Sequence, residues 1–340
     1  MIYDYQPENK LFPYSGLQVD GWIFAKELRK LGHDVTEYNM FTYNDNVGDP
    51  DVVMPVGFWG DLQYLKPTNK PVVPYMTSDG QIPKKYVDMI NGYSHWITQS
   101  ESCRKVSIRD GVQEDKISVV YPSPDIEVFK PIKRSEHYPP VVLTNFMHGG
   151  DRELIEAVPT ALSKGARFTL ILKIHHKITK EHKKWVDPLR EQLGIENNVV
   201  WMDVQVTNSD MPKFYQYSDL YVSLGGIIGF ELPFQEANAC GIPVIGLNYG
   251  AVPEFIKDGY NGFMIPVLRK EPYKTTKAGI ELTEERPIGD AKVAGEKIAQ
   301  LLVDKDLWYK MSENSRNQVE GKFNSVVQAK EMNRILEKVI

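Results

Sequence analysis

The chain has 340 residues, enough for two domains, and 42% of them are hydrophobic, enough for two cores. A formal net charge of −5 gives no overall positive field, which argues against a nucleic-acid partner. The two cysteines, Cys103 and Cys240, lie far apart and indicate neither a metal cluster nor a disulfide framework. No stretch is apolar enough to cross a membrane and the N-terminus lacks an apolar signal core, so we expect a cytoplasmic protein.

The first 132 residues alternate between strand and helix patterns, which predicts an α/β domain. Helical spacing predicts a helix ending near Leu31, and Ser100 is a suitable N-cap for a later helix that ends at Gly111. Apolar runs predict strands over residues 2–5, 34–38, 71–76, 94–98 and 116–121.

Two charged features have competing interpretations. Asp49-Pro50-Asp51 has the D-x-D form of a metal-binding pair, but it lies in a turn, so we favour a solvated turn and predict no metal site.

Residues 173–190 are dense in lysine and histidine. Adjacent histidines point apart, which argues against a metal site there. We favour a solvated helix face over a membrane-surface patch, and peripheral membrane contact stays open.

A polar, proline-rich segment over residues 132–140 predicts an interdomain linker, so we divide the chain after residue 132. The second half again predicts strands, over residues 141–143, 168–173, 198–202, 220–224 and 242–246. Helices are expected over residues 152–163, 210–217, 291–304, 305–320 and 325–340. Residues 267–290 are polar and lack periodicity, so we expect an inserted loop of unknown role.

The stretch from Gly225 to Gly262 repeats one arrangement, in which a strand leads through a glycine-rich turn into a short helix. In an open α/β sheet this arrangement directs backbone N–H groups and helix N-termini at one crevice. The sequence therefore predicts a phosphate-binding site at this stretch.

This stretch resembles the donor-binding segment of retaining glycosyltransferase family 4, whose members have the GT-B fold. The matches include Gly229-Phe230, Leu232-Pro233, Glu236-Ala237, Ala239-Cys240-Gly241 and Pro243-Val244-Ile245. The resemblance implies two facing Rossmann-like domains with a cleft between them. Residues 1–132 would form the acceptor-side domain, joined by a C-terminal helix over about 325–340 that crosses back. Residues 133–324 would form the nucleotide-sugar donor domain.

The resemblance also implies roles for single residues of the donor segment. Glu236 matches the family glutamate that accepts hydrogen bonds from ribose hydroxyls, and Gly229, Phe230 and Leu232 would surround the donor. A helix N-terminal glutamate favoured by the dipole is the alternative for Glu236. The other family glutamate, which contacts the donor sugar, falls at Ile228, which accepts no hydrogen bond. Glu231 is the candidate to replace it as a catalytic residue.

In the first domain, the resemblance implies that Gly16 lies close to the donor diphosphate or the acceptor; an ordinary turn is the alternative. Asp79 is carried over as a catalytic polar residue reaching into the cleft, and an Asp-Gly turn residue is equally favoured. The family's diphosphate-neutralising arginine and lysine are absent from their positions. We rank Lys173 first, His148 second and Arg152 third as substitutes.

The resemblance thus implies a retaining glycosyltransferase that uses no metal or cofactor and takes a nucleotide-diphosphate sugar as co-substrate. The acceptor would be a glycan, a lipid-linked molecule or a small molecule. The alternatives are a non-catalytic nucleotide-sugar-binding protein and a sugar-nucleotide epimerase or phosphorylase of the same architecture. The sequence does not indicate the base, the sugar, the linkage or the oligomeric state.

Overall fold

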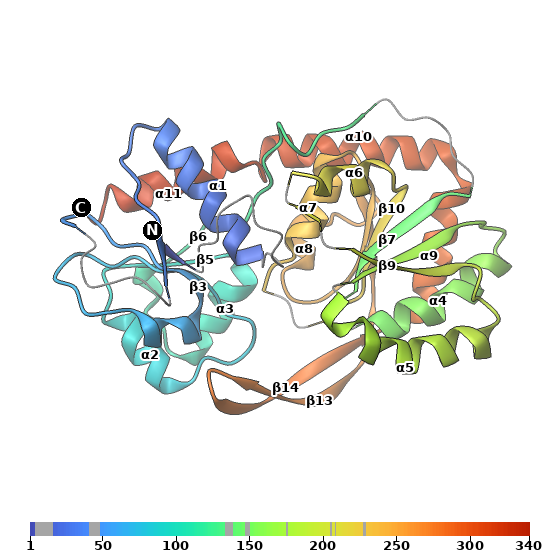
Figure 1. Cartoon of the computed structure of the whole chain (residues 1–340), viewed down its shortest axis with the longest axis horizontal. Helices are drawn as coiled ribbons and strands as arrows, with labels where there is room; N and C mark the ends of the chain where they lie inside the picture. The colour runs from blue at the N-terminus through green and yellow to red at the C-terminus, as the bar shows by residue number, and fades with distance from the viewer. Residues whose placement is uncertain are drawn as a thin grey trace. The chain divides into compact units, whose positions relative to one another are not determined.

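A computed structural model describes residues 1–3, 16–40, 48–132, 139–146, 150–174, 176–204, 206–207, 209–226 and 229–340. The chain forms two compact units (Figure 1). Unit 1 contains Met1–Asp125, Pro272–Glu284 and Lys322–Ile340, and unit 2 contains Ile126–Glu271 and Glu285–Gly321. The units divide after Asp125, whereas the sequence placed the division after residue 132.

Unit 1 is built on a parallel sheet with the strand order β3-β4-β5-β6. The strands are β3 (Val56–Phe58), β4 (Tyr75–Thr77), β5 (Trp96–Thr98) and β6 (Ile117–Val119). A separate parallel pair joins β1 (Ile2–Tyr3) to β2 (Tyr38–Asn39), so the strand expected over residues 34–38 contributes only its last residue. The helices are α1 (Gly16–Lys30), α2 (Lys84–Asn91), α3 (Glu101–Asp110) and α11 (Ser325–Leu336), with short 3-10 turns at η1 (Trp59–Tyr64) and η2 (Glu114–Lys116).

Helices cover both faces of this sheet (Figure 1). Adjacent residues of β4 show the alternation, because Tyr75 packs with residues of α1 and α11 while Met76 packs with residues of α2. The predicted cap of α3 is confirmed: Ser100 Oγ accepts a 3.0 Å hydrogen bond from the backbone N–H of Cys103.

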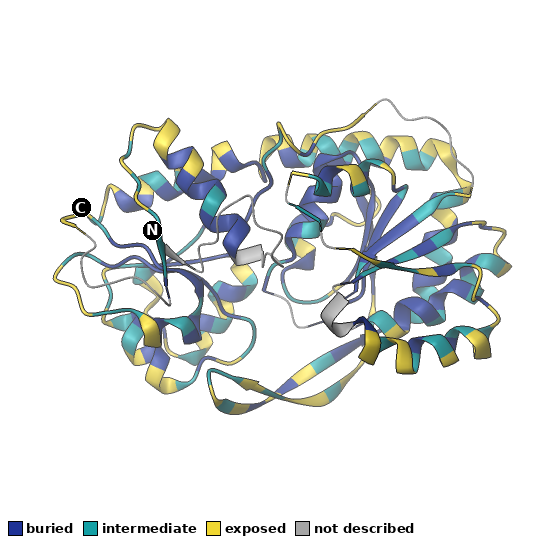
Figure 2. Ribbon diagram, in the orientation of Figure 1, coloured by how far each residue is buried: buried dark blue, intermediate teal, exposed yellow. Residues whose placement is uncertain are grey.

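Unit 2 is built on a parallel sheet with the strand order β12-β11-β10-β7-β8-β9. The strands are β7 (Val141–Asn145), β8 (Thr169–Ile174), β9 (Val199–Asp203), β10 (Leu220–Ser223), β11 (Val244–Leu247) and β12 (Gly262–Ile265). The helices are α4 (Asp151–Ser163), α5 (His176–Leu193), α6 (Met211–Gln216), α7 (Leu232–Ala239), α8 (Val252–Phe255), α9 (Ala291–Val303) and α10 (Lys305–Gly321). Apart from the edge strand β9, these strands are largely buried (Figure 2).

The strand order reverses direction between β7 and β10, which is the topological switch point of the unit 2 sheet. The chain leaves the carboxyl ends of these two strands toward opposite sides, and in open α/β sheets ligands bind in the crevice that results. The loops from β7 to α4 and from β10 to α7 are therefore the places to examine for a site.

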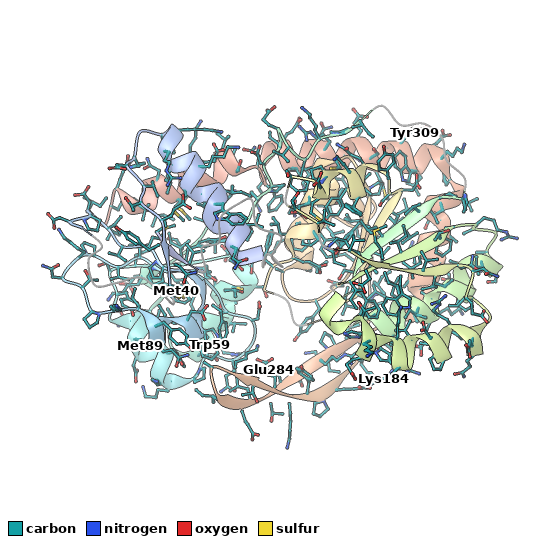
Figure 3. The ribbon with its side chains drawn as sticks, in the orientation of Figure 1. Met40, Trp59, Met89, Lys184, Glu284 and Tyr309 are labelled. Carbon is teal, nitrogen blue, oxygen red and sulfur yellow. The ribbon has the colours of Figure 1, made fainter. Side chains whose placement is uncertain are left out.

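The expectation of an inserted loop over residues 267–290 was wrong. These residues form a hairpin of β13 (Val267–Lys277) and β14 (Ile280–Gly289), connected by Ala278 and Gly279, both with positive φ. Most β13 residues are exposed, so no apolar alternation marked the strand. The outer part of the hairpin, which includes Glu284 (Figure 3), belongs to unit 1, while its base belongs to unit 2.

Helix α5 carries the lysine- and histidine-rich segment. Lys184, labelled in Figure 3, is exposed and pairs with Glu181 one turn earlier, as expected of a solvated helix face. None of the helices in the described part of the chain combines the length and apolar character that a membrane span requires.

Candidate functional site

Glu236 lies in α7, the helix that follows β10 at the switch point of unit 2. Its side chain is buried, and its Oε2 accepts a 2.6 Å hydrogen bond from the hydroxyl of Tyr215. Burial raises the pKa of Glu236 to about 7, while the Tyr215 hydrogen bond and the charge of Lys173 act in the opposite direction. The carboxylate is thus held in place by a neutral donor and lies near a positive charge.

Lys173 approaches Glu236 from β8, on the other side of β7 in the sheet. Its neighbours Leu172 and Ile174 point into the core under α4, so the alternation of a strand directs Lys173 to the opposite face, where α7 lies. Burial lowers the pKa of Lys173, and the negative charge of Glu236 opposes that fall. The structure therefore brings together two of the predicted donor-site residues.

Glu231 precedes the first residue of α7 and is also buried, with 2% of its surface exposed. Its Oε1 accepts a 2.7 Å hydrogen bond from the hydroxyl of Tyr221, and its Oε2 accepts a 3.0 Å bond from Ser223 Oγ. Both donors lie on β10, so the carboxylate ties the start of α7 back to the strand. Each oxygen can accept a second hydrogen bond, so these two bonds hold the carboxylate in place and leave it able to accept one from a ligand.

Sequence reasoning missed Tyr215, Tyr221 and Ser223. The spacing of Tyr221 and Ser223 on the predicted strand was a usable signal, because residues two apart point to one face. The rings of Tyr215 and Tyr221 lie 5.9 Å apart between centroids, so the two glutamate–tyrosine pairs are neighbours. The side-chain amide of Asn145, at the end of β7, also bonds to the Tyr215 hydroxyl.

The glycines of the two loops let their backbones touch. Gly150 caps α4 with φ +73°, and a Cβ built on it would lie 2.0 Å from the carbonyl oxygen of Leu224. A Cβ on Gly226 would lie 2.3 Å from Cγ of Pro287. Three segments that are distant in sequence therefore meet where β7 and β10 end.

The remaining predicted donor residues of unit 2 have different surroundings. Gly229 is buried, and the half-buried ring of Phe230 packs 5.2 Å from the ring of Phe255. Leu232 is buried as the first residue of α7. Arg152 is largely exposed and pairs with Glu156 along α4. His148 lies outside the described residues.

In unit 1, Gly16 begins α1, and its surroundings lie outside the described residues. Asp79 follows β4, as expected, and its Oδ1 accepts a 3.0 Å hydrogen bond from Thr77 Oγ1. Its backbone carbonyl accepts from Lys277 Nζ on β13. Asp49 is exposed and pairs with Lys70. Within the described ranges, no group of three or more histidine, cysteine, aspartate or glutamate side chains is arranged to hold a metal ion.

A family model and several curated relatives match part of this chain. Residues 150–276 match the family model of "Glycosyl transferases group 1". N-acetyl-alpha-D-glucosaminyl L-malate synthase from Bacillus anthracis is 29% identical over 137 residues, which is 40% of this chain and 30% of the relative. D-inositol 3-phosphate glycosyltransferase from Mycobacterium tuberculosis is 24% identical over 178 residues, covering 50% of this chain and 37% of the relative. The chain thus matches about a third of these relatives' length.

Solved structures resemble the whole chain. A glycosyltransferase from Rickettsia africae superimposes with a TM-score of 0.75 and 16% identity, covering 99% of this chain and 97% of that one. Anabaena HepE, solved in complex with UDP and glucose, gives a TM-score of 0.70 and 15% identity, covering 99% of each chain. The predicted fold of two Rossmann-like domains is confirmed, and the family resemblance is confirmed over the matched segment.

Proposed function

We propose that this protein is a retaining glycosyltransferase that moves a sugar from a nucleoside diphosphate sugar to an acceptor hydroxyl without a metal. Glu236 is the residue on which the proposal rests. Tyr215 engages Oε2, and in the described part of the chain Oε1 has no hydrogen-bond partner. We assign Oε1 to the ribose hydroxyls of the donor, because bonds from hydroxyls to a carboxylate are strong and fix the orientation of the ligand.

We assign the donor diphosphate to the glycine-rich loops that follow β7 and β10. Backbone N–H groups at the starts of α4 and α7 favour an anion there, and Lys173 supplies positive charge beside them. The leaving nucleoside diphosphate gains negative charge as the glycosidic bond breaks, so these groups stabilise the transition state more than the bound donor.

Retention follows if the acceptor hydroxyl attacks from the face that the diphosphate leaves. A phosphate oxygen of the leaving group then accepts the hydroxyl proton, and no covalent intermediate with the protein forms. Asp79 in unit 1 stays our candidate for a catalytic residue. Since both oxygens of Glu231 accept hydrogen bonds from β10, we assign Glu231 the role of fixing the turn around the donor sugar.

Thermal unfolding with UDP, GDP, ADP and their glucose conjugates tests the donor site. UDP is the first choice because HepE was solved with it. A ligand at one hundred times its dissociation constant stabilises a protein by about 2.7 kcal/mol, which moves the midpoint by several degrees. We expect a shift with one base that Glu236→Ala abolishes. The absence of a shift with every nucleotide would remove the basis of the proposal.

A turnover assay then separates a transferase from a protein that only binds nucleotide sugars. The transferase releases nucleoside diphosphate in step with sugar transfer, and release is unchanged by EDTA. An epimerase would instead convert the sugar without transferring it to an acceptor. Binding without any turnover across a panel of glycan, lipid-linked and small-molecule acceptors would favour the binding protein.

A further inference from the structure

The returning strand of the hairpin, β14, ends across the carboxyl edge of the unit 2 sheet. A Cβ built on Gly289 would lie 2.9 Å from Leu247 Cδ1, at the end of β11. Two residues earlier, Pro287 packs against Gly226 in the loop that follows β10. The base of the hairpin therefore lies beside the glycine-rich loop to which the proposed function assigns the donor.

Arg286 immediately precedes Pro287 in β14, and its side chain reaches the first turn of α4. Its Nη2 lies 3.4 Å and 3.5 Å from the two carboxylate oxygens of Glu153, the third residue of that helix. The Glu153 side chain is 8% exposed and that of Arg286 is 36% exposed. Among the described residues, Nη2 is the one nitrogen of Arg286 with a partner.

These contacts place Arg286 beside the first turn of α4, next to the residue that touches the loop after β10. Glu153 lies one turn after Gly150, whose backbone is packed against the Leu224 carbonyl at the start of the other loop. The neighbour of Arg286, Pro287, touches that same loop at Gly226. A guanidinium held here by one nitrogen has further N–H donors for an anion that binds at the loops.

Two other cations considered for this site, Arg152 and Lys173, each have an acidic neighbour. Arg152 pairs with Glu156 on the exposed side of α4, and Lys173 is partly buried beside Glu236. The contacts of Arg286 with Glu153, at 3.4 Å and 3.5 Å, are at the long, weak end of hydrogen-bonding distance. Arginine also matches phosphate geometry with paired N–H groups, which a lysine cannot do.

We propose that Arg286 binds the diphosphate of the donor, so that the hairpin base supplies a cation missing from the loop between β7 and α4. This inference rests on the proposed function, because it assumes that a nucleoside diphosphate occupies the switch point. It also gives the base of the 267–289 hairpin a role in unit 2, namely binding the donor diphosphate.

Calorimetric titration of the full chain tests the inference with UDP, GDP and ADP, each compared with its nucleoside. We expect Arg286→Ala to weaken binding of the recognised diphosphate roughly 10- to 100-fold, as for loss of a hydrogen bond to a charged group, and to leave nucleoside binding unchanged. Arg286→Lys should retain part of the affinity, because it keeps the charge and loses the paired geometry.

Arg269→Ala is the matched control, since Arg269 lies on β13 of the same hairpin and pairs with the neighbouring Glu271. We expect it to leave diphosphate affinity within twofold. If Arg286→Ala does not fold, Arg286→Gln keeps a side chain of similar length for the same titration.

The possible results separate the role of Arg286 from the proposed glycosyltransferase function. A wild-type chain that binds none of the diphosphates overturns the proposed function and this inference with it. A wild-type chain that binds one of them, with Arg286→Ala equal to Arg269→Ala, overturns the role of Arg286 alone. Equal losses for diphosphate and nucleoside in Arg286→Ala also overturn it, because a phosphate contact would spare the nucleoside.

Discussion

The hydroxyl of Tyr215 donates a 2.6 Å hydrogen bond to Oε2 of Glu236, and both residues are buried. The tyrosine comes from α6 and the glutamate from α7, and α6 precedes β10 while α7 follows it. The hydrogen bond holds Oε2 of Glu236 and so orients the whole carboxylate, including Oε1. In the proposed function, Tyr215 therefore affects donor recognition through Glu236 and does not need to touch the donor.

Replacing Tyr215 by phenylalanine should weaken donor binding without removing it. The hydrogen bond from Tyr215 holds the pKa of Glu236 down, so its loss raises that pKa above about 7 and leaves less carboxylate at neutral pH. We expect the affinity for the recognised nucleoside diphosphate to fall roughly 10- to 100-fold at pH 7, in line with the loss of one hydrogen bond to a charged group.

The measurement is a set of calorimetric titrations from pH 6 to pH 9. The titration midpoint should move to higher pH in Tyr215→Phe, and the two proteins should converge at high pH. Tyr217→Phe is the control, because Tyr217 is 66% exposed at the end of the same helix. An unchanged midpoint in Tyr215→Phe would contradict the role of the hydrogen bond.

Glu236→Gln should affect stability and binding in opposite directions. Burial raises the folded-state pKa of Glu236 above its ordinary value to about 7. Below about pH 4.3, the pKa of an unfolded glutamate, the carboxyl group is protonated in both states and the folded protein has the full stability from this group. That stability is lost as the pH rises through about 7, where the buried group ionises. At pH 8 the buried charge therefore costs stability on the order of 3 kcal/mol, which glutamine removes.

Thermal unfolding at pH 5 and pH 8 checks this prediction. The midpoint of Glu236→Gln should exceed that of the wild type at pH 8 and come close to it at pH 5, while nucleotide binding falls at pH 8. A variant that is less stable than the wild type at pH 8 would mean that Glu236 is a structural carboxylate rather than a ligand-binding one.

Tyr221→Phe should destabilise the start of α7. Tyr221 donates to the buried Glu231 carboxylate, and removing one donor from a buried charge costs about 1–3 kcal/mol. Ser223→Ala removes the other donor and should have an effect of the same sign. Urea unfolding measures both, and the double variant should be less than additive if the two bonds serve one group. Wild-type stability in both single variants would refute the role we assign to Glu231.

Gly150→Ala should disrupt the junction of the two loops. A methyl group there meets the Leu224 carbonyl at 2.0 Å in addition to the strain of a positive φ. Gly165→Ala is the control, because Gly165 also has a positive φ of +93° but no atom lies within 4 Å of the added methyl group. It should therefore lower the stability by only about 1–2 kcal/mol. We expect Gly150→Ala to lose clearly more stability in urea unfolding, and to lose nucleotide binding. Equal costs for the two variants would show that the loops separate easily.

The strands and helices that carry the site could be predicted from the sequence, because apolar runs and glycines mark them locally. The proximity of Lys173 and Glu236 could not be derived from spacing, since it depends on the order of β8, β7 and β10 in the sheet. The hairpin was missed because polar residues fill most of β13. Arg286 was missed with it, as its partner Glu153 is 133 residues away in sequence.

The most direct measurement of the central claim is proton NMR of the first sugar product formed from a nucleotide sugar, beginning with UDP-glucose. We predict that the wild type transfers or releases the sugar with the anomeric configuration of the donor, and that Glu236→Ala does so at a greatly reduced rate. An inverted first product would contradict the retaining mechanism. Full activity in Glu236→Ala would contradict the donor site built around that residue.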